Sequence, residues 1–320
     1  MFALLSKINK NLVIAIPAAM LAGFLFGLTG FQNKLANLIV PMTFLMVYPM
    51  MATLRIKSLL RWNDTRLQFA AQLVNFCIIP FISLGVGFIF FNDKPYYALG
   101  LFLASLLPTS GMTISWTGFA KGNLEAAVKM TVFGLTMGSL ALPFYLYLFM
   151  GESVQFEIMS IIRQIAIIVF IPMIFGHLTR TWLVRKHGES GFKEKIAPRF
   201  SSFSTIGVLG IVFIAISLKS DYLMSNLDSL LYILAASVSM YVINYLLSTI
   251  IGRCFFTGKD AIALVYGTVM RNLSIALAIS MNSFGDIGSQ IALVIAIAFI
   301  IQVQSAAWYI RFTQVLFKDK

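Results

Sequence analysis

One arginine lies in the middle of an apolar segment that is long enough to cross a lipid bilayer. In residues 260–284, Arg271 and Asn272 stand near the midpoint. The small and polar residues around them are Gly267, Thr268 and Ser274. A guanidinium at mid-membrane costs from about 3 to more than 10 kcal/mol, so it marks a pathway, a partner or a bound ion. Two interpretations stay open: a structural arginine satisfied by backbone carbonyls between packed helices, or a broken helix at a transport site.

A second apolar segment, residues 95–119, is interrupted at the same depth. Pro108 removes a backbone donor there. The residues that follow it are Thr109, Ser110, Gly111 and Thr113. Polar and glycine residues at this depth are tolerated where the backbone is buried in protein or lines a wet cavity. Matching interruptions in two halves of a chain indicate a transporter's substrate site, whereas the alternative is a proline kink beside a coincidental polar patch.

The composition is that of a polytopic membrane protein. The chain has 320 residues, of which 59% are hydrophobic and 11% charged, and its mean hydropathy is +0.88. The net charge of +12 is explained by basic cytoplasmic loops, so no nucleic-acid partner is expected. The first apolar run is interpreted as a retained span and not as a cleaved signal peptide.

Ten membrane spans are predicted from the apolar runs, each close to the length that crosses a hydrocarbon core of about 30 Å. Their predicted bounds are 11–30, 34–53, 67–91, 95–119, 123–149, 157–184, 201–218, 228–255, 260–284 and 288–315.

Positive charges predict the orientation of these spans. Of the 24 Lys and Arg residues, three lie on the side opposite to the termini and three lie within spans, and the others share one side. The two exceptional sets are Lys34, Lys94 and Lys219, and Lys129, Arg163 and Arg271. This bias places both termini in the cytoplasm of a protein of the cell (inner) membrane. We expect Lys129 to reach towards the cytoplasm, with Glu125 as its partner.

Five spans in each half imply an inverted repeat, because an odd number makes the halves enter the membrane in opposite orientations. Residues 1–150 form the predicted first repeat and residues 157–315 the second. Residues 1–184 thus hold the first repeat plus the first helix of the second, and residues 185–199 are predicted as a basic cytoplasmic loop.

Catalytic and metal-binding patterns are not found in the sequence. Cys77 and Cys254 are far apart and lack CxxC or Cys/His spacing, and His177 and His187 have no Cys or carboxylate company. There is no Walker loop and no hydrolase triad. We therefore expect no enzyme activity, no cofactor and no obligate protein partner.

Residues 108–123 resemble a motif of the bile acid:sodium symporter family. The matching residues are Pro108, Gly111, Lys121, Gly122 and Asn123. Trp116 and residues 46–52 (MVYPMMA) are closer to the related arsenite-efflux branch. The resemblance implies an all-α membrane protein with a panel domain and a core domain, in which broken fourth and ninth helices cross. It also implies sodium ions near the crossing and substrate between the domains.

The family's sodium-binding positions are largely substituted in this chain. The corresponding residues are Asn75, Thr113, Ile114, Ala127, Thr131, Gly267 and Arg271. Gly267 takes the position of a glutamate, and Arg271 repels a cation by roughly 4 kcal/mol at 4 Å. We expect the sodium site shared by Asn75 and the ninth span to be vacant, with Arg271 as a tethered cation, and a residual sodium site at Thr113 and Thr131.

The sequence thus predicts a secondary transporter of a small organic anion. The predicted substrate- and ion-binding residues are Asn75, Thr109, Ser110, Gly111, Thr113, Thr131, Gly267, Thr268, Arg271, Asn272 and Ser274, with the helix break at Pro108. The alternative is arsenite-type efflux, in which a cysteine of the arsenite branch corresponds to Thr109 here. Without that thiol, recognition by oxygen ligands stays open. A channel would need a longer polar lining than these residues provide.

Overall fold

The computed structural model describes residues 12–30, 32–53, 64–150, 158–218, 220–225 and 227–317. These residues are helical almost throughout and contain no β-strand, only one isolated bridge. The two termini, predicted to be cytoplasmic, and Lys219 lie outside the described residues.

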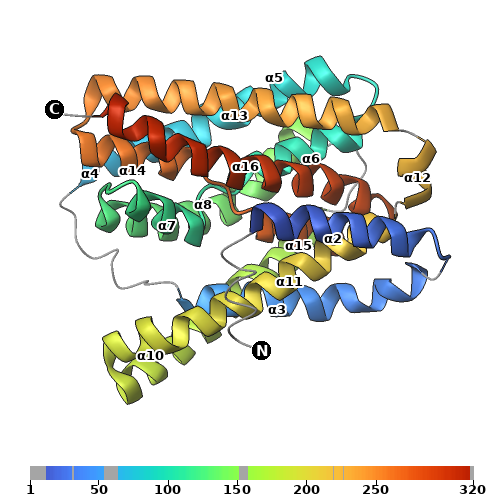
Figure 1. The fold of residues 1–320 in the computed structure, drawn as a ribbon, viewed down its shortest axis with the longest axis horizontal. Helices are drawn as coiled ribbons and strands as arrows, with labels where there is room; N and C mark the ends of the chain where they lie inside the picture. The colour runs from blue at the N-terminus through green and yellow to red at the C-terminus, as the bar shows by residue number, and fades with distance from the viewer. Residues whose placement is uncertain are drawn as a thin grey trace. The chain divides into compact units, whose positions relative to one another are not determined.

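The helices follow one another along the chain (Figure 1). They are α2 (Leu12–Gly27), η1 (Gln32–Leu38), α3 (Ile39–Thr53), α4 (Thr65–Leu73), η3 (Val74–Ile78), α5 (Ile79–Phe91), α6 (Pro95–Leu106), α7 (Gly111–Phe119), α8 (Leu124–Met150), α9 (Ile158–Ile165), η4 (Ala166–Phe170), α10 (Ile171–Gly191), η5 (Phe192–Ile196), α11 (Ala197–Ser217), α12 (Ser220–Ser225), α13 (Leu227–Phe255), α14 (Gly258–Val269), α15 (Leu273–Ser283), η6 (Gly285–Ile287) and α16 (Gly288–Leu316).

Helix lengths fit a membrane-spanning chain. Five described stretches are long and apolar enough to cross a bilayer: Thr65–Phe91, Leu124–Met150, Met159–Ser217, Asp228–Phe255 and Gly285–Thr313. Shorter apolar helices cover Ile14–Gly27, Ile39–Thr53, Pro95–Leu106 and Leu273–Ser283. Large apolar side chains also face outward, such as Phe88, Phe144 and Leu148, each at least 70% exposed. Such outward-facing apolar surfaces suit contact with lipid.

Residues 185–199 are not the predicted loop. The helical conformation of α10 continues to Gly191 and passes through η5 into α11. The direction changes at Gly188, whose φ of 73° lies in the left-handed region that glycine adopts without steric cost. A single glycine therefore makes the turn for which the sequence analysis assigned a loop.

Three short π-helices share one cause. Each of η3, η4 and η5 ends two residues before a proline, namely Pro80, Pro172 and Pro198. Proline lacks an N–H and its ring crowds the carbonyl four residues earlier, so the preceding turn widens. For Pro80 that carbonyl is Phe76 O, which accepts a hydrogen bond from the Tyr145 hydroxyl on α8.

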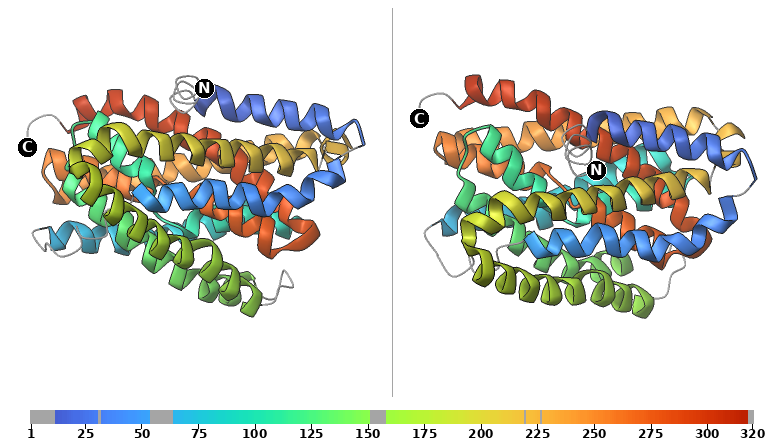
Figure 2. Two further views of the ribbon diagram at one scale, coloured as in Figure 1. Left: turned by 90° about the horizontal axis from the view of Figure 1, so that it is seen from below. Right: turned by 60° about the horizontal axis from the view of Figure 1, so that its bottom comes forward.

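The chain forms two compact units, and each takes segments from both halves of the sequence. The first unit comprises residues 1–54, 156–230 and 274–296. In it α11 packs against α2 and α3, and α3 lies between α10 and α11 (Figure 2). Close approach of helices needs small residues: a Cβ on Gly176 would lie 2.7 Å from the Ala52 nitrogen.

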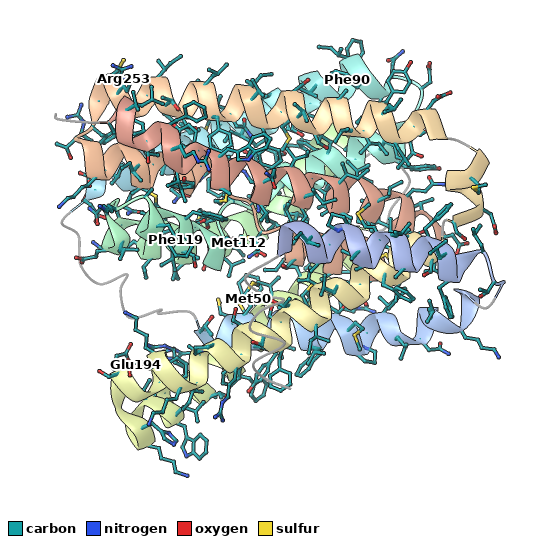
Figure 3. All side chains as sticks on the ribbon, in the orientation of Figure 1. Met50, Phe90, Met112, Phe119, Glu194 and Arg253 are labelled. Carbon is teal, nitrogen blue, oxygen red and sulfur yellow. The ribbon has the colours of Figure 1, made fainter. Side chains whose placement is uncertain are left out.

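The second unit comprises residues 55–155, 231–273 and 297–320. Here α14 packs against α4, α7 and α8, and α5 packs against α6. Met112 and Phe119 mark the beginning and the end of the short helix α7 (Figure 3). This unit contains both ends of the break between α6 and α7 and the bridge residues of the break between α14 and α15.

Candidate functional site

The first helix break separates α6 from α7 at the predicted position. Leu107 leaves the helical region (φ −101°, ψ 88°), as expected of a residue that precedes a proline. Thr109 has a φ of 64°, in the left-handed region that a β-branched residue rarely adopts. Ser110 is extended and caps α7. The chain is therefore not helical at Pro108, the residue at which the sequence predicts a break.

The second break separates α14 from α15 and contains neither proline nor glycine. Met270 is extended (φ −72°, ψ 125°). Thr109 N donates to Met270 O, and Asn272 N donates to Leu107 O, both at 2.8 Å. Pro108 and Arg271 thereby form an isolated antiparallel bridge. Because buried backbone groups must be hydrogen-bonded, each break satisfies groups that the other leaves free.

Gln302 on α16 holds the backbone of the second break. Its Oε1 accepts a hydrogen bond from Arg271 N at 2.7 Å, and its Nε2 donates to Arg271 O at 3.1 Å. The hydroxyl of Tyr241 on α13 donates to the same Oε1 at 2.9 Å. Gln302 therefore takes the place of the helical partners that Arg271 lost.

The guanidinium of Arg271 points at backbone carbonyls. The residue is 1% exposed. Nη1 donates to Ser105 O at 3.3 Å, Nη2 donates to Thr268 O, and Nε has no partner. None of the ion pairs formed among the described residues involves Arg271. Both open interpretations thus describe part of the site: the helix is broken, and carbonyls satisfy the arginine.

Helix α8 supports the first break. The Thr109 hydroxyl donates to Pro108 O at 2.6 Å and lies 3.3 Å from the carbonyl oxygens of Met130 and Thr131. A Cβ on Gly134 would lie 2.5 Å from Thr109 Oγ1, and one on Gly138 would lie 2.8 Å from Pro108 Cδ. The break fits against α8 because α8 has glycine at these two positions.

Asn75 connects η3 to α14. Its Nδ2 donates to Gly267 O at 3.0 Å, whereas its Oδ1 has no partner. A Cβ added to Gly267 would collide with Sδ of Met130, so the methionine side chain would have to move to admit it. The space of a side chain at position 267 is therefore filled by methionine.

Most hydroxyls at the start of α7 bind the local backbone. Ser110 Oγ accepts a hydrogen bond from Met112 N at 3.2 Å, and Ser110 N donates to Thr113 Oγ1 at 3.1 Å. Thr131 Oγ1 donates to Ala127 O at 2.8 Å and lies 3.4 Å from Ser110 O. Gly111 is exposed, and nothing lies within 4 Å of its Cβ position.

The remaining predicted residues are divided between the two units. Thr268 donates to Ser248 Oγ on α13 at 2.7 Å. Asn272 is buried within the second break. Ser274 is half-buried on α15 and belongs to the first unit.

Several contacts of this cluster are not among those predicted from the sequence. Gln302, Tyr241 and Ser248 are buried polar residues in apolar helices, and that rarity was the available signal. Ser105 contributes only a carbonyl and Met130 only its bulk, so neither carried a signal in the sequence.

The side chain of Lys129 is buried, not extended towards solvent as expected. Its Nζ lies 2.6 Å from Asp64 Oδ1 and 3.5 Å from Glu125 Oε1, so the predicted partner Glu125 is confirmed and Asp64 was missed. Lys129 lines a cavity of about 370 Å³ at the beginning of α4, α8 and α14. Asn123 joins two of these helices, because its Nδ2 donates to Asp260 Oδ1 at 2.8 Å.

A family model described as the sodium bile acid symporter family matches residues 40–226. The chain is 24% identical over 310 residues to the arsenical-resistance protein Acr3 of Corynebacterium glutamicum, a match that covers 90% of this chain and 84% of that protein. It is 23% identical over 241 residues to the uncharacterised protein YbaS of Bacillus subtilis, covering 75% of this chain and 76% of that protein.

Sodium/bile acid cotransporter 7 of Mus musculus is 25% identical over 177 residues, covering 53% of this chain and 50% of that protein. The family model alone covers more than half of the 320 residues. With apolar helices long enough to cross a bilayer, this chain is an integral membrane protein that belongs to the sodium bile acid symporter family of transporters.

Proposed function

We propose that the protein is a secondary active transporter of a small organic anion, which crosses the membrane by alternating access at the two helix breaks. One observation carries this proposal: two broken helices are bridged backbone to backbone beside a buried arginine. Paired breaks of this kind place backbone groups and helix ends at mid-membrane, where many transporters bind their substrates.

Electrostatics favour an anion. The charge of Arg271 is not neutralised by any ion pair among the described residues. Helix α7 begins at Gly111, which is exposed. The N-terminus of a helix carries partial positive charge, which attracts anions. A carboxylate or oxyanion near the start of α7 would meet both sources of positive potential.

The remaining architecture belongs to the same proposal. Ten spans would form an inverted repeat of residues 1–150 and 157–315 in the inner membrane, with both termini on its cytoplasmic side. The first unit would correspond to the panel domain and the second unit to the core domain. Support comes from the helices found at each predicted span and from the two breaks in spans four and nine.

Arsenite-type efflux is the second candidate, because the match to Acr3 extends over 90% of this chain. The donors argue against thiol coordination. Thr109 lies at the break where a thiol is expected, and Cys77 and Cys254 are both exposed on the protein surface. A metalloid substrate would therefore be bound by oxygen and not by sulfur ligands.

Uptake into proteoliposomes tests the first candidate. We expect saturable uptake of at least one member of a panel of carboxylates and oxyanions, and a loss of about tenfold or more in Arg271→Gln. Arg311→Gln, which removes an exposed arginine on α16, is the matched control and should retain uptake. Uptake that rises linearly with substrate concentration would indicate a channel instead.

Metalloid sensitivity tests the second candidate. Cells that express the protein would tolerate more arsenite than cells without it, and the double variant Cys77→Ala/Cys254→Ala would protect equally well. Protection that disappears in the double variant would contradict oxygen-based recognition. No protection in either strain would leave the organic anion as the proposed substrate class.

A further inference from the structure

Two broken half-helices end at the guanidinium of Arg271. Ser105 is the last residue but one of α6, and Thr268 is the last residue but one of α14. Both present their carbonyl oxygens to Arg271. The last carbonyls of a helix lack intrahelical partners and carry the negative end of the helix dipole. Carbonyls of this kind, at the C-terminal ends of half-helices, are the groups that coordinate sodium in secondary transporters.

The positions around these carbonyls do not fit a sodium ion. Gly267 supplies no carboxylate, and Met130 Sδ occupies the space that a side chain at this position would need. Asn75 donates its Nδ2 hydrogen to Gly267 O, so that carbonyl already has a partner, and Asn75 Oδ1, which has none, is a single neutral oxygen. A sodium ion at about 4 Å from the guanidinium would also bind on the order of a thousandfold more weakly, because the two cations repel each other.

We propose that Arg271 is a tethered cation that takes the place of a coupling sodium ion at the crossing of the two breaks. The guanidinium is covalently attached, so these carbonyl oxygens keep a cationic hydrogen-bond donor through the whole transport cycle. The charge is never released to either side of the membrane. Substrate movement is therefore not driven by a sodium gradient at this position, although the chain belongs to a family named for sodium symport.

The consequence for coupling rests on the proposed transport function, but the tether itself is testable without a substrate. In detergent, we expect sodium chloride in place of choline chloride to raise the unfolding temperature of Arg271→Ala by about 2 °C or more beyond any rise in the native protein, because a site at Thr113 and Thr131 would respond equally in both. An equal response of the two proteins to sodium would overturn the proposal.

Chemical rescue asks whether the carbonyls need a cation. Arg271→Ala should unfold at a lower temperature than the native protein, and low millimolar methylguanidinium or sodium should raise that temperature by about 2 °C or more. Methylurea, which has a similar shape and no charge, should not. Equal stabilisation by methylurea, or none by either cation, would overturn the proposal. Arg311→Ala is the matched control and should respond to none of these compounds.

Transport measurements separate this inference from the proposed function. Uptake that proceeds equally in sodium and choline supports the tether, and uptake that requires a sodium gradient and is unchanged in Arg271→Gln contradicts it. Absence of uptake for every anion contradicts the proposed substrate class alone, because the unfolding and rescue experiments do not depend on it.

Discussion

The two helix breaks are bonded to each other but have different causes. In the first, Pro108 and the strained Thr109 interrupt the helix from within. In the second, Arg271 and the residues beside it could continue a helix, and the interruption is imposed by Gln302 and by the bridge to the first break. One break is therefore encoded locally, and the other depends on tertiary contacts.

Replacing Gln302 should cause the largest loss of stability, because it removes the contacts that impose the second break. Gln302→Leu leaves the buried N–H and C=O of Arg271 without partners, at about 1–3 kcal/mol for each group. We expect a loss of about 2–4 kcal/mol in the free energy of unfolding, measured by denaturant titration in detergent. Gln304→Leu changes a half-buried residue on the same helix and should cost little. Equal losses in the two variants would show that Gln302 does not hold the second break.

Filling the contact between α8 and the first break should have an intermediate effect. Gly134→Val places side-chain atoms against Thr109 and Pro108, and overpacking of this kind costs typically about 1–3 kcal/mol. The unfolding temperature and the rate of uptake would both decrease. Gly85→Val on α5, where nothing lies within 4 Å of the Cβ position, is the control. An unaffected Gly134→Val variant would mean that α8 and the break can separate without cost.

The difference between the breaks also explains what could be predicted from the sequence. Apolar runs and Pro108 report local properties, so the helices and the first break were predicted close to their observed bounds. The second break was predicted only as one of two interpretations of the polar cluster at residues 267–274 and as an implication of the family resemblance, because its cause lies on α16. The pairing of Lys129 with Asp64 was missed for the same reason, since the two residues are distant in sequence.

Ser105 and Met130 show a further limit. Every residue has a backbone carbonyl oxygen, so the sequence could not show which carbonyls bind the guanidinium of Arg271. Met130 looked like one more apolar residue of a span, yet its sulfur fills the space beside Gly267. Gly188 illustrates the same limit outside the site, because one left-handed glycine made the turn within the predicted loop.

Replacing Pro108 should have the smallest effect, although it is the clearest break signal in the sequence. In Pro108→Ala the bridge bonds Thr109 N to Met270 O and Asn272 N to Leu107 O remain, so the helix should stay broken. We expect a loss of about 0.4–1 kcal/mol in the free energy of unfolding, mainly because the unfolded chain becomes more flexible. Hydrogen exchange of the Thr109 amide should stay slow, with Gln302→Leu as the comparison in which the bridge is weakened.

If residues 95–119 instead became one continuous helix, judged from cysteine accessibility along α7, proline and not the bridge would maintain the first break. The two breaks would then be independent, and the tethered arginine would lose the carbonyl of Ser105 without any change at Gln302.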